Sequence, residues 1–200
     1  MDLVSRAQGI ILRPKEEWDK IKSESPTIVE LFTSYAMILA AIPAVAQFIG
    51  MGLIGRSVPF IGLYRYNIGT AFIYAILTYV FTLVTVYVFG IVINALAPTF
   101  SSKVDAVNAM KLAVFCMTPV WVAGVLHIVP LLSILVLLAS FYAFYVLYLG
   151  FNSPLMGTPK DKVVGYLLVS IVIYIVLMGV IMIFMGAIFA VGGIGSSRFY

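Results

Sequence analysis

Charged side chains are scarce in this sequence of 200 residues. Asp, Glu, Lys and Arg make up 10% of the chain, whereas 63% of the residues are hydrophobic. A soluble domain has roughly 25% charged residues because its surface faces water, so this composition excludes a large soluble domain. The formal net charge is +4, but the basic residues are scattered singly and form no patch of the kind that binds nucleic acid. The composition therefore indicates an integral membrane protein without a nucleic-acid partner.

Residues that build disulfides, metal sites and catalytic centres are also rare. The single cysteine, Cys116, has no partner for an intrachain disulfide, and the single histidine, His127, has no cysteine or carboxylate near it in the sequence. A structural zinc site needs four such ligands. No pattern of residues supplies an acid, a base or an activated nucleophile. We therefore predict no metal site, no cofactor, no catalytic residue and no enzymatic activity.

Four long segments lack charge altogether, namely residues 31–55, 66–102, 112–159 and 163–197. A helix crosses a bilayer with about 20 apolar residues, so three of these segments predict one span each. The segment 112–159 is long enough for two spans and is interrupted by His127 and Pro130, which predicts a helical hairpin. Its first half contains Pro119 and Gly124, so a re-entrant segment is an alternative there. The sequence thus predicts an all-α integral membrane protein, a single domain over 1–200 with a tail over 1–30 and spans at approximately 31–54, 70–97, 110–126, 130–151 and 163–191.

The basic residues of the connections predict an orientation. With five spans, nine basic residues fall on the side of the N-terminus and three on the other side. Cytoplasmic segments carry the excess of Lys and Arg, so we expect a cytoplasmic N-terminus and an extracytoplasmic C-terminus. The nine are Arg6, Arg13, Lys15, Lys20, Lys22, Lys103, Lys111, Lys160 and Lys162, and the three are Arg56, Arg65 and Arg198.

The tail shows two short helical patterns. Apolar residues recur between Leu3 and Ile11 with the spacing of one helix face. Pro14 suits the first position of a second helix, on which Trp18 and Ile21 share an apolar face. We expect two short amphipathic helices that lie along the membrane interface. The sequence Thr27-Ile28-Val29-Glu30 is typical of a capping box and predicts the start of the first span.

Polar residues of the second span gather on one face. At 100° per residue they fall within an arc of roughly 80°. The face can line a path for a polar ligand, or its hydroxyls can bond to the preceding turn and to neighbouring helices, which is the commoner use of Thr in spanning helices. Pro119 adds a kink that could act as the moving part of a carrier. The face consists of Asn67, Tyr74, Thr78, Thr82 and Thr85.

The tail string Pro14-Lys15-Glu16-Glu17-Trp18-Asp19-Lys20-Ile21, followed by Pro26-Thr27, resembles the entry signature of the Yip family. These are Ypt/Rab-interacting membrane proteins with five spans, and they have many prokaryotic relatives. The resemblance continues through the five-span profile and Met117-Thr118-Pro119-Val120 in the third span. In eukaryotes the family implies vesicle trafficking and organelle shaping through small GTPases, usually with a long cytosolic N-terminal region. The short tail here is closer to the prokaryotic members, which implies a prokaryotic plasma membrane and no expected GTPase.

The leading functional hypothesis is a non-enzymatic scaffold, adaptor or membrane-organising protein. In this hypothesis Pro14, Trp18 and Ile21 contact a protein partner or the rest of the bundle. The alternative is a small carrier or channel for an uncharged or lipidic solute, lined by Asn67, Tyr74, Thr78, Thr82, Thr85 and Pro119. The expected partners are the lipid bilayer, a protein at the cytoplasmic tail and, as an open option, further copies of the chain in a homo-oligomer. Ala36, Ala40 and Ala44 would allow close packing within the chain or between copies.

Overall fold

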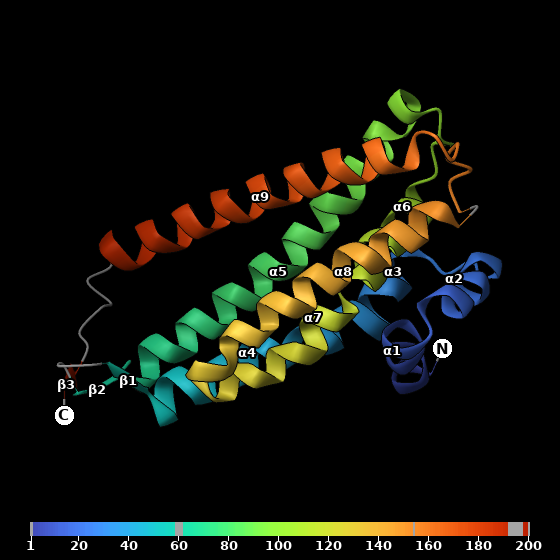
Figure 1. Ribbon diagram of the computed structural model, residues 1–200. Helices are drawn as coiled ribbons and strands as arrows, with labels where there is room; N and C mark the ends of the chain where they lie inside the picture. The colour runs from blue at the N-terminus through green and yellow to red at the C-terminus, as the bar shows by residue number, and fades with distance from the viewer. Residues whose placement is uncertain (1, 59–61, 154, 192–197, 200) are drawn as a thin grey trace.

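A computed structural model of the chain describes residues 2–58, 62–153, 155–191 and 198–199. It contains five helical segments that are long and apolar enough to cross a membrane, which confirms the predicted all-α membrane bundle. The described ends of the chain lie at opposite ends of this elongated bundle (Figure 1). We refer to them as the tail end, which carries α1 and α2, and the far end, which carries the strands. The five segments are Ile28–Ile54, Ile68–Phe100, Ala106–Ile128, Leu131–Asn152 and Val163–Ile188.

The first two segments begin at capped positions. The backbone amide of Glu30 donates to the Thr27 hydroxyl at 3.1 Å, and the amide of Thr27 donates to the Glu30 carboxylate at 2.7 Å, so the predicted capping box is present. The second segment begins at Asn67, whose side chain accepts from the Thr70 amide at 2.7 Å. The first segment comprises α3 (Ile28–Leu31), η1 (Phe32–Ala36), α4 (Met37–Phe48) and η2 (Ile49–Ile54), and the second comprises α5 (Ile68–Leu96) and η3 (Ala97–Phe100).

The third segment is the centre of the bundle. In its most apolar stretch 72% of the residues are buried, against 6% to 33% in the other four segments. It also has the lowest hydropathy, 1.7, whereas the least buried segment has the highest, 3.0. Lipid accepts only apolar side chains, but a helix surrounded by other helices can include Thr, Pro and small residues. The segment consists of α6 (Ala106–Cys116), α7 (Thr118–Ala123) and η4 (Gly124–Ile128), with Pro119 in the first turn of α7.

The last two segments are a tightly connected helix and a peripheral one. His127 Nδ1 lies 2.9 Å from the Ser133 hydroxyl and closes the hairpin that leads through η5 (Pro130–Ser133) into α8 (Ile134–Asn152). The final helix, α9 (Val163–Val191), lies near α5 and α8 at the tail end and diverges from α5 towards the far end (Figure 1). Helix α9 therefore packs against α5 along only part of the length of α5.

A small antiparallel sheet at the far end was not predicted. Its strand order is β1-β2-β3, and Tyr64 pairs with Arg56 on one side and with Phe199 on the other. The strands are too short to show an alternating pattern in the sequence, and the pairing of β2 with β3 joins positions far apart in the chain. The strands are β1 (Arg56–Val58), β2 (Gly62–Arg65) and β3 (Arg198–Phe199).

The tail packs onto the bundle. Helices α1 (Leu3–Leu12) and α2 (Pro14–Ser23) lie against the tail end, where α1 contacts α7 and α2 contacts α8 (Figure 1). Ile10, Trp18 and Ile21 belong to the same buried cluster as Phe115 and Val146. The predicted amphipathic helices are therefore present, but their apolar faces contact the protein instead of a lipid surface.

Candidate functional site

The apolar face of α2 fits against the spanning helices. Trp18 is 1% exposed, and its indole nitrogen donates to the carbonyl oxygen of Val146 in α8 at 3.0 Å. Its ring meets Phe115 edge-on with ring centroids 6.2 Å apart. Gly150 allows this approach, because a Cβ at that position would lie 2.8 Å from Trp18 Cζ2. Ile21 and Pro14 are buried too, so of the two contacts considered for the tail residues, a protein partner or the rest of the bundle, the docked tail has the contact with the bundle.

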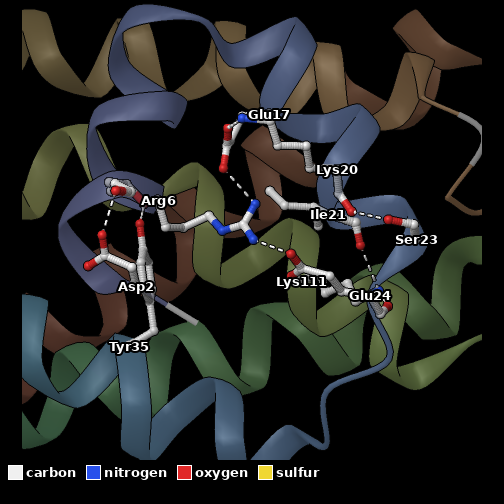
Figure 2. Close-up of polar contacts among 11 residues, drawn as sticks. Asp2, Arg6, Glu17, Lys20, Ile21, Ser23, Glu24, Tyr35 and Lys111 are labelled. Carbon is white, nitrogen blue, oxygen red and sulfur yellow. Dashed lines mark hydrogen bonds and ion pairs between the residues drawn. The ribbon is translucent and has the colours of Figure 1, made fainter.

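A buried ionic network joins the two tail helices (Figure 2). Arg6 of α1 is 6% exposed and Glu17 of α2 is 5% exposed, and their guanidinium and carboxylate groups are 2.6 Å apart. A second guanidinium nitrogen of Arg6 pairs with Glu24, and Lys20 Nζ lies 2.9 Å from Glu17. Charged groups stay buried only when they are paired and hydrogen-bonded. The network therefore fixes α1, α2 and the segment after α2 in one arrangement.

Lys111 of α6 holds the end of α2. This lysine is 2% exposed, and its ammonium donates to the carbonyl oxygen of Ile21 at 3.1 Å and also to the carbonyl oxygen of Glu24. The last carbonyls of a helix lack partners within the helix and carry its negative dipole end, so a cation is favourable there. The charge count grouped Lys111 with the connections, although the predicted span 110–126 includes it, and in the structure it lies in α6 within the third apolar segment. The spanning helices thus bind α2 at Trp18 and at its C-terminal end.

The sequence pattern alone does not single out Arg6 or Glu17, although a signal was present. Arg6 lies three residues after Leu3 and four before Ile10, so it lies on the apolar face of α1. Glu17 occupies the equivalent place on α2, directly before Trp18. One positive and one negative charge on two apolar faces predict an ion pair if the faces meet.

A pocket of about 470 Å³ lies between α5 and α9. Four of the five residues of the polar face on α5 line it, which are Tyr74, Thr78, Thr82 and Thr85. The opposite wall comes from α9, and Gln47 of α4 and Tyr66 complete the described lining. The Tyr66 and Tyr74 rings stack with centroids 6.4 Å apart. The helical spacing of the polar face has therefore brought its residues to one cavity.

Hydrogen bonding differs along this polar face. The Thr85 hydroxyl donates to the carbonyl oxygen of Phe81 at 2.6 Å, which is the bond to the preceding turn that the sequence suggested. Thr78 and Thr82 make no hydrogen bond to any residue within the described part of the chain, and the side-chain oxygen of Gln47 is buried there without a hydrogen-bond partner. The pocket therefore offers polar groups that a ligand can satisfy.

The remaining predicted lining residues lie elsewhere. Asn67 caps the start of α5, and Pro119 is buried in α7 beside Thr118, whose hydroxyl lies 2.8 Å from the Tyr35 hydroxyl. Neither belongs to the residues that line the pocket. Within residues 2–58, 62–153, 155–191 and 198–199, no three His, Cys, Asp or Glu side chains lie close enough to hold a metal ion.

Comparison with known proteins places this architecture in a family. The sequence model of the Yip1 domain matches residues 9–194, a region that includes α2 and all five spanning segments. The chain belongs to the Yip1 family. This Yip1 protein is 30% identical over 153 residues to the inner membrane protein YohC of Escherichia coli K12, a match that covers 75% of this chain and 78% of YohC. YohC of Escherichia coli O6:H1 gives the same values. No solved structure shows significant similarity.

The family assignment confirms the resemblance found in the tail of the sequence. The string from Pro14 to Ile21 lies inside the matched region. In this Yip1 protein the string makes α2, with proline at its first position and the two apolar residues that dock it. The YohC relatives are named as inner membrane proteins, and this chain has five apolar segments long enough to cross a membrane. Both observations support an integral membrane protein.

Proposed function

We propose that this Yip1 protein is a non-enzymatic membrane adaptor that presents the outer face of α2 to a protein partner. The two sides of α2 carry this proposal. Its inner side, with Trp18 and Ile21, is buried against the bundle, whereas its outer side is exposed and charged. Docking orders the helix before a partner arrives, which lowers the entropic cost of binding. The outer side consists of Lys15, Glu16, Asp19, Lys20 and Lys22.

The proposed partner has a polar surface of mixed charge and lies in the cytoplasm of a prokaryotic cell. The excess of basic residues at the tail end supports this orientation. Trp18 and Ile21 act in this proposal by holding α2 in place, and the charged residues make the contact. Because exposed charges dominate, the association should weaken as the salt concentration rises.

Mild crosslinking in cells, followed by gentle extraction and native mass spectrometry, tests the adaptor. The variant Asp19→Lys/Lys22→Glu reverses two charges on the outer face of α2 and should abolish the crosslinked partner. The matched control Lys103→Glu/Asp161→Lys reverses two exposed charges in the connections at the same end and should leave the partner in place. A partner retained by both variants, or crosslinks only to further copies of the chain, would refute the adaptor.

The pocket favours a second candidate, a carrier for an uncharged or lipidic solute. Tyr74, Thr78 and Thr82 line a cavity within the spanning segments, as a solute path requires. Glycerol flux into liposomes that contain the protein, followed by light scattering, tests this function. The rate should exceed that of protein-free liposomes and should fall in Thr78→Val/Thr82→Val. Equal rates with and without protein would refute the carrier for small solutes.

A further inference from the structure

The pocket between α5 and α9 has the depth of one leaflet. Its lining on α5 runs from Tyr74 to Thr85, which are eleven residue steps apart and therefore about 16 Å at 1.5 Å per step. That length is about half of the ~30 Å hydrocarbon core of a bilayer. Since α5 begins at Ile68 at the far end and continues to Leu96, the pocket begins nearer the far end than the tail end. Its volume of about 470 Å³ is within the range of small-molecule sites.

The α9 wall of the pocket borders the outside of the bundle, because its lining residues Met182 and Gly186 are exposed. Helix α9 diverges from α5 towards the far end (Figure 1). Gly186 lines the pocket, and a Cβ at this position would meet no atom within 4 Å. A ligand can therefore enter between the two helices without passing through the tightly packed centre of the bundle.

The walls combine an apolar side with uncharged polar groups. Helix α9 contributes Met178, Met182 and Met185, whose flexible thioether chains adapt to an irregular hydrocarbon chain. Helix α5 contributes the Thr78 and Thr82 hydroxyls opposite them. Every described residue that lines the pocket is uncharged, so a charged group buried there would lack a counter-ion.

The unsatisfied groups define the polar part of the ligand. Thr78 and Thr82 line the pocket and can each donate and accept, whereas the Gln47 oxygen is fully buried and has no donor in the described part of the chain. A hydroxyl group on the ligand would donate to the hydroxyl oxygen of one threonine. An ester carbonyl oxygen of the ligand would accept from the hydroxyl group of the other threonine.

From this combination we infer that the pocket binds an uncharged lipid with a hydroxyl group and a hydrocarbon chain, of which diacylglycerol is the representative. The inference does not depend on the adaptor function. It shares its site with the carrier function, but it requires binding alone and no transport.

A photoactivatable diacylglycerol tests the inference. The full-length protein is reconstituted in phosphatidylcholine vesicles that contain a trace of diacylglycerol with a diazirine on its acyl chain, and labelled peptides are identified by mass spectrometry after illumination. Labels should appear in residues 74–85 of α5 and 178–186 of α9. Unlabelled diacylglycerol should compete, whereas additional phosphatidylcholine should not.

Two glycines of α9 provide a matched pair of variants. Gly186→Leu places a side chain in the pocket and should reduce labelling at least about tenfold, which corresponds to about 1.4 kcal/mol of binding free energy. A Cβ at Gly179 would likewise meet no atom within 4 Å, but Gly179 is not one of the lining residues, so Gly179→Leu should keep wild-type labelling. Thr78→Val/Thr82→Val, which removes hydroxyls at nearly constant shape, should weaken labelling about three- to tenfold.

Three outcomes would overturn the inference. The first is wild-type labelling in Gly186→Leu, and the second is a loss of labelling in Gly179→Leu as large as that in Gly186→Leu. The third is labelling of the same peptides by a phosphatidylcholine that carries a diazirine, with phosphatidylcholine and diacylglycerol competing equally well. That third outcome would indicate that the pocket holds ordinary bilayer lipid. Circular dichroism and thermal unfolding of each variant separate loss of binding from loss of fold, and Gln47→Leu gives a second polar variant on another helix. If the protein gives no glycerol flux but is still labelled by the diacylglycerol probe, the carrier function is rejected and the lipid-binding inference stands.

Discussion

The indole nitrogen of Trp18 donates to the carbonyl oxygen of Val146 at 3.0 Å, although 128 positions separate the two residues. A second bond joins α8 to the tail, because the Tyr142 hydroxyl donates to the carbonyl oxygen of Ile11 in α1 at 2.7 Å. Helix α8 therefore holds both α1 and α2. The tail signature of this Yip1 protein encodes an intramolecular contact, in which Pro14 begins the helix and Trp18 docks it.

Trp18→Ala should release the tail from the bundle. Removal of a fully buried tryptophan costs about 3–5 kcal/mol, and here the loss falls mainly on docking of α1 and α2. Hydrogen exchange in nanodiscs should show faster exchange of the α1 and α2 amides with little change in α5. Leu12→Ala, at a position that is 74% exposed, should leave the exchange unchanged. Equal protection in Trp18→Ala and wild type would show that the tail is held by other contacts.

Gly150→Ala should loosen the tail without altering a tail residue. The added Cβ would lie 2.5 Å from Leu112 Cδ2 and 2.8 Å from Trp18 Cζ2, and such overpacking costs about 1–3 kcal/mol. Gly179→Ala is the matched control, because a Cβ there meets no atom within 4 Å, and alanine in place of helical glycine stabilises by roughly 0.5–1 kcal/mol. Thermal unfolding should thus shift in opposite directions for the two variants. A downward shift of the same size in both would contradict the role given to Gly150.

Arg6→Met should destabilise the docked tail more than the double variant Arg6→Met/Glu17→Leu. Loss of Arg6 leaves the buried Glu17 carboxylate with the exposed Lys20 as its one remaining ionic partner among the described residues, so the cost should be at most that of an unpaired buried charge, about 3–5 kcal/mol, whereas an apolar replacement of both partners is often close to neutral. Hydrogen exchange of α2 amides measures the difference. Arg13→Met is the control, because the Arg13–Glu16 pair is 3.8 Å apart and exposed, and such pairs contribute about 0–1 kcal/mol. Additive effects of the two substitutions would argue against a coupled pair.

Features that depend on local sequence were predicted well. Charge-free segments gave the five spans, because lipid excludes charge wherever a helix meets it. The capping box at Thr27 and Glu30 was predicted because both partners lie within one turn. Helical periodicity also grouped Thr78 and Thr82 on one face, which the structure places at one pocket.

Features that depend on which elements meet were not predictable in the same way. Lys111 precedes an uncharged segment, and only the arrival of α2 makes it a buried residue that binds the Ile21 carbonyl. Asn67 was assigned to the polar face because of its angular position on the helix, but in the structure it caps the start of α5. Its position three residues before Thr70, just ahead of the apolar run, was the signal for a cap. The pairing of β2 with β3 joins positions far apart in the chain, so no local sequence pattern predicts it.

The orientation of the bundle can be tested with single cysteines. The native Cys116 is 0% exposed, so it should contribute little background to labelling with a membrane-impermeant maleimide. Ser23→Cys places a thiol on the exposed side at the end of α2, and Val129→Cys places one at a residue 43% exposed in the hairpin before α8. The excess of basic residues at the tail end predicts that Val129→Cys reacts in intact spheroplasts, whereas Ser23→Cys reacts only after permeabilisation. The reverse pattern would place the tail outside the cell and remove the cytoplasmic adaptor. Reaction of both thiols in intact spheroplasts would contradict an odd number of spans between them, because α5 and the first and third segments separate these two positions.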